Sequence, residues 1–264
     1  MGRMTGKVAV VTGAAQGIGR GVAVRLAQEG ACIVIGDVQD ERGQAAAATI
    51  LASGHEATYC HADVVSEEQC AALIEAAVSS YGRLDVLVNN AGGMPRGTLE
   101  ETTTDLWEEV IRVDLRGAFY CCKYAVPRMR QTGGGSIVNI GSIAGIQGLP
   151  NMVAYASAKG GLLALTRTLA GAFVRDRIRV NYVIPGWVLS EGELALQHNS
   201  GVTDETLQAV ATTMPTGRHQ TVEDTANAVI YLASDESSQV TGTVLHLDAG
   251  ASELPVQPTA SYTA

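Results

Sequence analysis

The stretch VAVVTGAAQGIG, residues 8–19, decides the fold because it joins a short apolar run to a glycine-rich loop. Its first four residues, Val8–Val11, predict a buried strand, and the amphipathic stretch Gly19–Glu29 predicts the helix that follows. The three glycines, spaced G-x-x-x-G-x-G, let the backbone turn tightly and approach a ligand without a Cβ in the way. The N–H groups and positive dipole end of the helix suit a phosphate. The stretch therefore favours a pyrophosphate-binding loop, although a plain strand-to-helix turn could use the same glycines.

The same alternation of strand and helix continues along the chain. Further apolar runs predict strands at Ile33–Ile35, Ala57–Cys60, Val86–Val88, Ser136–Ile140, Arg179–Val183 and Val244–Leu247. Amphipathic stretches predict helices at Glu41–Ser53, Glu67–Tyr81, Asp105–Met129, Ala154–Val174 and Val222–Ala233, and the third of these is long enough for two helices broken near Gly117. Such alternation predicts a doubly wound, Rossmann-type α/β fold, a parallel sheet of about seven strands with helices on both faces.

The composition predicts one globular domain, since 46% of the 264 residues are hydrophobic and 17% are charged. No linker or internal repeat divides the chain, so we expect a single domain over residues 1–252 with a substrate lid at about 187–214. The tail, residues 253–264, is polar and holds two prolines. It either lacks fixed structure or packs on a neighbouring subunit.

Charge and residue spacing exclude several classes of protein. The formal net charge of −9, without any Lys/Arg-rich run, argues against nucleic acid or an anionic membrane as a partner. The five cysteines show no C-x-x-C spacing and the five histidines are scattered, so we expect neither a disulfide framework nor a metal site. No signal peptide and no apolar run of ~18–20 residues is found, which favours a cytoplasmic protein.

Unusual side chains follow the predicted strands at the point where each strand ends. In a doubly wound sheet, ligands bind at this carboxyl edge. After the glycine loop of the first strand come, strand by strand, Asp37, Asp63, Asn89-Asn90-Ala91-Gly92-Gly93, Ser142 and Pro185-Gly186. A purely structural protein would need turns at these places but not this choice of side chains.

Asp37 indicates which dinucleotide the edge would hold. A carboxylate 18 residues beyond Gly19 can accept hydrogen bonds from the adenosine ribose hydroxyls and would repel a 2′-phosphate. No arginine or lysine stands beside it, because Gln16 is neutral and Val38 follows. These residues favour NAD over NADP, while a simple turn aspartate is the alternative.

Tyr155 and Lys159 lie four residues apart in a predicted helix and so share one face. A free tyrosine, with a pKa of ~10, is a poor base at neutral pH, but a neighbouring ammonium favours its phenolate. Such pairs also occur on helix surfaces without any function. Ser142, 13 residues earlier at a strand end, supplies a hydroxyl for a substrate oxygen and makes a catalytic role the better interpretation.

Together these motifs resemble the short-chain dehydrogenase/reductase family, in its compact single-domain form, from about Lys7 to Gly250. The resemblance implies that Tyr155 is the general acid/base, that Ser142 holds the substrate oxygen and that Lys159 assists the tyrosine. It implies a homo-oligomer, a tetramer or dimer, built through the long helices. It also implies cofactor contacts from Gly13, Gln16, Gly17, Ile18, Gly19, Asp37, Asp63, Val64, Asn90, Ala91, Gly92, Tyr155, Lys159, Pro185, Gly186, Val188 and Ser190.

Two positions depart from the family pattern. Asp114 stands where the family commonly has an asparagine that helps to hold a water in a proton relay behind the lysine. We therefore add Asp114 to the catalytic set and expect it to keep the relay while changing the pH dependence. Ser190 stands where the family often has a threonine that contacts the nicotinamide end, and its hydroxyl preserves that contact.

Three functions are compatible with these residues. The leading one is an NAD-dependent dehydrogenase of a polyol, sugar or other small neutral hydroxylated substrate, because the lid segment carries carboxylates such as Glu191 and Glu193. The second is a ketoreductase of acyl or steroid-like substrates. The third is a dinucleotide-binding sensor without chemistry, which the Ser142, Tyr155 and Lys159 set disfavours.

Overall fold

The structure is a computed structural model that describes residues 2–250, so the predicted tail lies outside the described residues. Seven parallel strands form one sheet in the order β3-β2-β1-β4-β5-β6-β7. Their bounds are β1 Val8–Thr12, β2 Cys32–Asp37, β3 Ala57–His61, β4 Val86–Asn89, β5 Gly135–Ile140, β6 Ile178–Pro185 and β7 Val244–Leu247. Strand order reverses between β1 and β4, the point at which such sheets bind ligands. The predicted doubly wound fold is confirmed.

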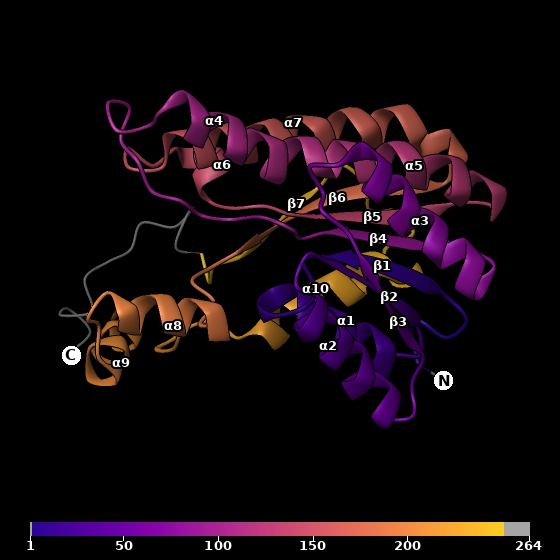
Figure 1. Ribbon diagram of the computed structural model, residues 1–264, viewed down its shortest axis with the longest axis horizontal. Helices are drawn as coiled ribbons and strands as arrows, with labels where there is room; N and C mark the ends of the chain where they lie inside the picture. The colour runs from indigo at the N-terminus through magenta and orange to yellow at the C-terminus, as the bar shows by residue number, and fades with distance from the viewer. Residues whose placement is uncertain (1, 251–264) are drawn as a thin grey trace, which may run out of the picture.

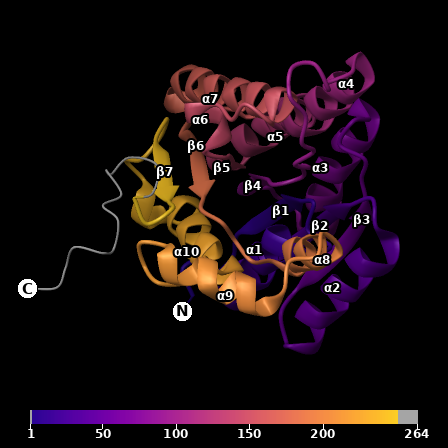
Figure 2. The same cartoon turned by 90° about the vertical axis from the view of Figure 1, so that its left-hand side faces the viewer.

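Helices cover both faces of the sheet (Figures 1 and 2). On one face lie α1 (Gly17–Gln28), α2 (Asp40–Ala52) and α10 (Val222–Ala233). On the other lie α3 (Glu67–Tyr81), α5 (Gly117–Gln131) and α7 (Val153–Phe173). Among the described residues, no helix is both long and apolar enough to cross a membrane.

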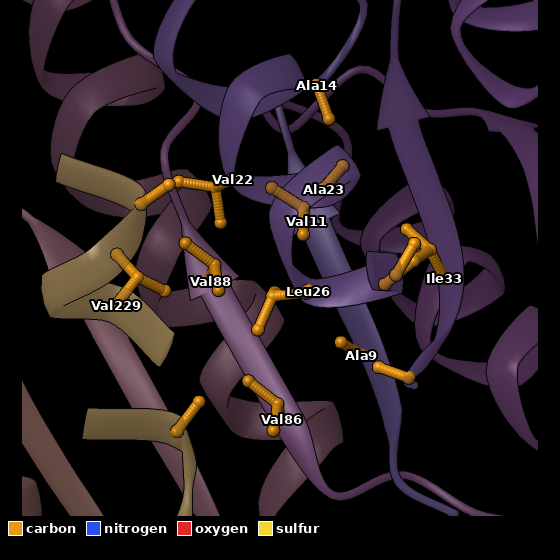
Figure 3. Packing of buried hydrophobic residues seen from close by; sticks show 14 of the residues in the cluster. Ala9, Val11, Ala14, Val22, Ala23, Leu26, Ile33, Val86, Val88 and Val229 are labelled. Atoms are coloured by element: carbon orange, nitrogen blue, oxygen red, sulfur yellow. The ribbon is translucent and has the colours of Figure 1, made fainter. Parts of the chain in front are cut away.

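The apolar strand runs are explained by burial on both faces. Along β1, Ala9 and Val11 pack into the cluster under α1 and α10, whereas Val8 and Val10 pack into the cluster on the opposite face. Figure 3 shows the first cluster, in which side chains of β1 meet Leu26 of α1. This rigid double layer fixes where each strand ends and therefore where the strand-end side chains lie.

The long stretch predicted as two helices does divide, but the chain never leaves a helical conformation. Between α4 (Thr104–Ile111) and α5, residues Arg112–Arg116 form a π-helix, and Gly117 itself is right-handed helical with φ −58°. A Cβ at Gly117 would lie 2.7 Å from Cβ of Val64, so close packing rather than a break requires the glycine. π-Helical turns occur frequently at functional sites, and this one carries Asp114.

The segment after β6 contains two helices that the sequence did not predict, α8 (Glu191–Asn199) and α9 (Asp204–Thr213). A third unpredicted helix, α6, spans Ala144–Gln147. The segment returns to its own start, because Gln220 exchanges backbone hydrogen bonds with Trp187 and Leu189 at 3.1 Å each. The excursion thus closes at residue 220, beyond the predicted lid end at 214. In Figures 1 and 2, α8 and α9 stand off the carboxyl edge of the sheet.

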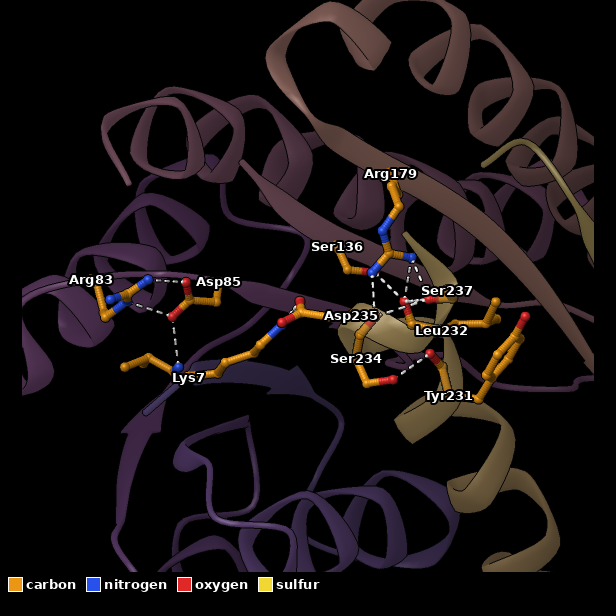
Figure 4. Close-up of polar contacts among 11 residues, drawn as sticks. Lys7, Arg83, Asp85, Ser136, Arg179, Tyr231, Leu232, Ser234, Asp235 and Ser237 are labelled. Carbon is orange, nitrogen blue, oxygen red and sulfur yellow. Dashed lines mark hydrogen bonds and ion pairs between the residues drawn. The ribbon is translucent and has the colours of Figure 1, made fainter. Parts of the chain in front are cut away.

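The amino edge of the sheet carries charged side chains that each make several hydrogen bonds (Figure 4). Asp85 accepts two hydrogen bonds from Arg83, at 2.7 and 2.8 Å, and one from the backbone N–H of Val8. Arg179 donates to the carbonyl of Leu232 at 2.6 Å, and further bonds reach the hydroxyl of Ser237 and the carbonyl of Ser234. The Asp85 contacts tie the start of β1 to the segment before β4, and the Arg179 contacts tie β6 to the end of α10.

Candidate active site

Helix α7 carries Tyr155 and Lys159 at the carboxyl edge of the sheet, and both residues are buried, 8% and 4% exposed. The ammonium nitrogen of Lys159 lies 5.5 Å from the centroid of the Tyr155 ring. The same nitrogen donates to the carbonyl of Ile140, the last residue of β5, at 3.2 Å. The four-residue spacing thus produces a tyrosine with a cation fixed against its ring.

Ser142 is joined to the same helix through Tyr182 of β6, a residue that the sequence analysis did not single out. The Tyr182 hydroxyl accepts from the backbone N–H of Ser142 at 3.2 Å and donates to the carbonyl of Lys159 at 3.0 Å. A Cβ at Gly141 would lie 2.0 Å from the Tyr182 ring, so only glycine fits there. Burial raises the pKa of Tyr182, which keeps its hydroxyl protonated as a donor.

Asp114 contacts Lys159 directly. One carboxylate oxygen, Oδ1, lies 3.1 Å from the lysine nitrogen, and the other accepts from the N–H of Gly93 at 3.2 Å. The exposed fraction of each side chain is only 2% for Asp114 and 6% for Lys159. A Cβ at Gly92 would lie 2.4 Å from Oδ1, so this glycine is required by the carboxylate.

Opposing effects set the charges of this pair. Burial raises the pKa of Asp114, and the nearby ammonium only partly offsets this. Burial is the largest single effect and would lower the pKa of Lys159, but the Asp114 carboxylate, with smaller contributions from Tyr155 and Tyr182, outweighs it, and the pKa of Lys159 is raised. The lysine is therefore held in its charged form by a buried counterion.

Hydrogen bonds join the glycine loop to the segment that follows β4. The amide of Asn90 donates to the carbonyls of Thr12 and Gly13 at 3.0 and 2.9 Å, while the Thr12 hydroxyl accepts from the N–H groups of Asn90 and Ala91. A Cβ at Gly13, whose φ is +62°, would lie 2.8 Å from Cα of Ala91. Larger residues would therefore separate the two loops that border the switch point.

The start of α1 fits a phosphate. Its N-cap is Gln16, whose side chain makes no capping hydrogen bond, so the first N–H groups of the helix have no side-chain acceptor there. Gly17, with φ +58°, has no atom nearer to a Cβ than Ser190, at 3.7 Å. Ile18 packs at the edge of the core. The loop thus presents backbone donors and open space to a dinucleotide pyrophosphate.

Asp37, 6% exposed, ends β2 and binds the glycine loop. Its carboxylate accepts from the N–H of Ala15 at 2.9 Å and from the N–H of Gln39 at 3.0 Å. The sequence neighbours of Asp37 are uncharged, as expected, but the fold brings in a cation from further along. Arg42 of α2 donates to the side-chain oxygen of Gln16 at 2.5 Å.

The remaining predicted cofactor residues lie at the same edge. Asp63 follows β3 and accepts from the N–H of Val65, while Val64 is buried. The N–H of Gly186, just after Pro185, donates to the Gln220 side chain at 2.5 Å. Val188 is buried, 7% exposed, in the base of the lid segment, two residues before Ser190.

Ser190 caps α8 by accepting from the N–H of Glu193 at 3.2 Å. An ion pair between Arg20 of α1 and Glu191 of α8, at 2.5 Å, holds the lid segment next to the loop. The lid thus lies over the start of α1.

Two residues of the site, Tyr182 and Gln220, were not singled out from the sequence. Tyr182 resembled an ordinary core residue of a strand, and Gly141 beside Ser142 was the one hint of a bulky neighbour. Gln220, which closes the base of the lid, lies 34 residues from its partner Gly186, and nothing in its local sequence marks it. Contacts of this kind depend on the fold.

The fold and the site define a class: a dinucleotide-binding loop at the switch point of a parallel sheet, beside a buried tyrosine–lysine pair suited to proton transfer. The sequence family described as Enoyl-(Acyl carrier protein) reductase matches residues 13–252. The chain belongs to the short-chain dehydrogenase/reductase family. It is therefore an oxidoreductase of the kind that uses a nicotinamide dinucleotide.

Individual relatives cover almost the whole chain. Trans-4-hydroxycyclohexanecarboxylate dehydrogenase of Sinomonas cyclohexanicum is 41% identical, covering 94% of this chain and 93% of its own. 3-Oxoacyl-[acyl-carrier-protein] reductase FabG of Thermotoga maritima is 36% identical, covering 94% and 98%. The crystal structure of levodione reductase has a TM-score of 0.89 at 33% identity, covering 95% of this chain and 99% of that one.

Proposed function

We propose that this protein, as one domain over residues 1–252 with a lid near 187–214, is an NAD(H)-dependent dehydrogenase of a secondary alcohol. The substrate would be a polyol, sugar or other small neutral hydroxylated compound. The observation that carries the proposal is the buried Tyr155 with the Lys159 ammonium 5.5 Å from its ring centroid, at the sheet edge that holds the glycine loop. The nicotinamide, when bound, supplies the hydride acceptor or donor.

Each side chain has a defined part in the reaction. In oxidation, Tyr155 takes the proton of the substrate hydroxyl as the hydride leaves the carbinol carbon, and in reduction it returns that proton. Ser142 accepts from the N–H of Ala144 at 3.2 Å, so its own O–H is available to the substrate oxygen. Lys159 stabilises the phenolate, and Asp114 holds the lysine in place and charged.

Asp37 supports NAD as the cofactor, because its carboxylate lies at the end of β2, where the ribose of a bound adenosine is expected. The loop residues and Ser190 of the lid would hold the pyrophosphate and the nicotinamide end. The relative from Sinomonas cyclohexanicum is named for a ring that bears a secondary alcohol, which supports a secondary alcohol as the reacting group. The same ring bears a carboxylate, so this relative does not support the neutral character of the proposed substrate. Members of the family commonly form oligomers, which supports a homo-oligomer, a tetramer or dimer, through the long helices α5 and α7.

The FabG relative favours one alternative, a ketoreductase of acyl substrates. The carboxylates of the lid segment do not distinguish strongly between a neutral alcohol and an anionic acyl substrate. Glu191 is neutralised by Arg20, and Glu193 accepts hydrogen bonds from Trp187 and Gln197. A carboxylate already paired in this way contributes little to the rejection of an anionic substrate. A non-catalytic sensor is the less favoured alternative, because it has no use for a buried tyrosine base.

Replacing Tyr155 by phenylalanine tests the chemistry. With a panel of secondary alcohols and NAD, we expect Tyr155→Phe to lower kcat by about 10²–10⁴-fold, the usual contribution of a general acid/base. NADH binding, followed by fluorescence, should stay within about threefold, since the ring remains in place. Turnover by the variant at the wild-type rate would refute the mechanism. Wild-type protein that binds NADH but oxidises no alcohol and reduces no ketone would favour the sensor.

A further inference from the structure

Arg42, in the first turn of α2, lies between two side chains that border the glycine loop and Asp37. Its Nη1 donates to the side-chain oxygens of Gln16, at 2.5 Å, and of Gln39, at 3.1 Å. Gln16 precedes Gly17 of the loop, and the backbone N–H of Gln39 donates to the Asp37 carboxylate. The guanidinium is thus held near Asp37, the residue proposed to accept hydrogen bonds from the adenosine ribose.

The charge of Arg42 is not neutralised by the protein. Within residues 2–250 the contacts of its guanidinium are to amide oxygens, and no carboxylate lies within ion-pair distance. Arg20, the other arginine nearby, is paired with Glu191. A guanidinium has five N–H donors, so Arg42 keeps donors for a further acceptor, and its side chain is exposed.

An open groove of about 290 Å³ lies beside this arginine. It is bounded by three parts of the chain, the glycine loop with α1, the start of α2, and the lid helix α8. Its lining includes Gln16, Arg20, Arg42, Ala45, Ala46 and Glu191. The groove is wide enough for a phosphate, and the small side chains of α2 leave Arg42 accessible within it.

We infer that Arg42, oriented by Gln16 and Gln39, is a specificity-determining residue that binds a phosphate on the adenosine 2′ position. This inference rests on the proposed dehydrogenase function and extends it: the enzyme accepts NADP(H) as a weaker second cofactor beside NAD(H). Asp37 repels the 2′-phosphate and loses a ribose hydroxyl as a partner, which makes NAD the better cofactor. Arg42 supplies a planar pair of donors that matches a phosphate, which keeps NADP from being excluded.

The test uses two nucleotides that differ only in the 2′-phosphate of interest, 5′-AMP and adenosine 2′,5′-bisphosphate. Their Kd values would be measured by calorimetry on the full chain, for wild type, Arg42→Ala, Arg42→Lys and the matched control Arg20→Ala. We expect Arg42→Ala to weaken the bisphosphate at least tenfold and 5′-AMP less than twofold, with Arg42→Lys between. Arg20→Ala should change both ligands by the same factor, since Arg20 is already paired. The kcat/KM ratio of NADP to NAD should fall in parallel.

Two results would overturn the inference. In the first, Arg42→Ala weakens both nucleotides equally, which would make Arg42 a structural support of α2. In the second, wild type binds the bisphosphate with the same Kd as Arg42→Ala. Both leave the proposed function intact, provided that wild type binds NADH and oxidises an alcohol. Failure of wild type to bind either nucleotide would instead overturn the proposed function together with the inference.

Discussion

The two edges of the sheet use buried charge in different ways. At the amino edge, Arg179 donates to three oxygens and Asp85 accepts three hydrogen bonds. At the carboxyl edge, Asp114 and Lys159 form an ion pair at 3.1 Å, yet Oδ1 of Asp114 accepts no well-aligned hydrogen bond from the described residues. Both edges belong to one sheet, as Figure 1 shows, and Figure 4 shows the contacts at the amino edge.

The two edges differ in how fully their buried charged groups are hydrogen-bonded, and this difference separates structural groups from reactive ones. Buried charges that only hold structure are normally satisfied completely, because each unmet donor or acceptor is costly. At the amino edge, the hydrogen bonds of Arg179 and Asp85 go to groups that hold the strand starts, so these charges stabilise the chain. At the carboxyl edge, by contrast, Oδ1 of Asp114 beside Lys159 lacks a well-aligned hydrogen bond, as expected where a site must exchange protons. Variants at the two edges should therefore separate rate from stability.

The largest effect is expected from Lys159→Met. Loss of the ammonium removes the stabilisation of the Tyr155 phenolate, and we expect kcat to fall by about 10²–10⁴-fold. The same change leaves Asp114 as an unpaired buried charge, which should lower the free energy of unfolding by about 3–5 kcal/mol. Kinetics with NAD and urea unfolding would measure the two effects.

The double variant Lys159→Met/Asp114→Asn is the matched control. With the unpaired charge removed, we expect most of the stability to return while kcat stays at the level of the single variant. If stability and rate were restored together, Lys159 would act through the fold alone, and the contrast between the edges would lose its basis.

At the amino edge, Arg179→Met should show the converse pattern. The carbonyls of Leu232 and Ser234 lose a charged donor in a partly buried place, and we expect the free energy of unfolding to drop by about 1–3 kcal/mol. The value of kcat should remain within twofold. Urea unfolding compared with Arg128→Ala, which breaks an exposed ion pair with Glu75 worth about 0–1 kcal/mol, would check this. A loss of kcat in Arg179→Met without a loss of stability would contradict it.

How far the sequence predicted this molecule depended on the range of the contact. The strands of the sheet follow from short apolar runs, the shared face of Tyr155 and Lys159 follows from a period of about 3.6 residues, and both were predicted. Helices α8 and α9 were missed because few of their side chains are buried, so no apolar face marks them.

Contacts between distant parts of the chain were beyond such patterns. Asp114 could be recognised as unusual, but its direct contact with Lys159, 45 residues away, depends on the π-helix that positions it. Likewise, Asp37 was recognised from the sequence but the nearby Arg42 was not, because only the turn into α2 brings that arginine back to the glycine loop. Local periodicity predicts which face a residue occupies, whereas the partner across the site is set by how elements pack.

The smallest expected effect concerns the pH dependence of Asp114→Asn. The carboxylate raises the pKa of Lys159 against the opposing effect of burial, so the lysine keeps its proton to a higher pH than usual. Without that charge, the largest effect that opposes burial is lost and the pKa of Lys159 falls. The variant should therefore lose activity at a lower pH as the pH rises, with the alkaline limb of its pH–rate profile shifted to lower pH.

Below that limb, the Asp114→Asn variant should work at least as well as the wild type. A neutral amide no longer draws on the lysine charge, so the ammonium acts more fully on Tyr155. Asparagine retains an oxygen that can accept from the N–H of Gly93, so the loop geometry should persist. The kcat profile between pH 6 and 10 would distinguish a shifted limb from a uniform loss. An unshifted limb would mean that the carboxylate orients Lys159 without tuning it, and the carboxyl edge would then differ from the amino edge in geometry alone.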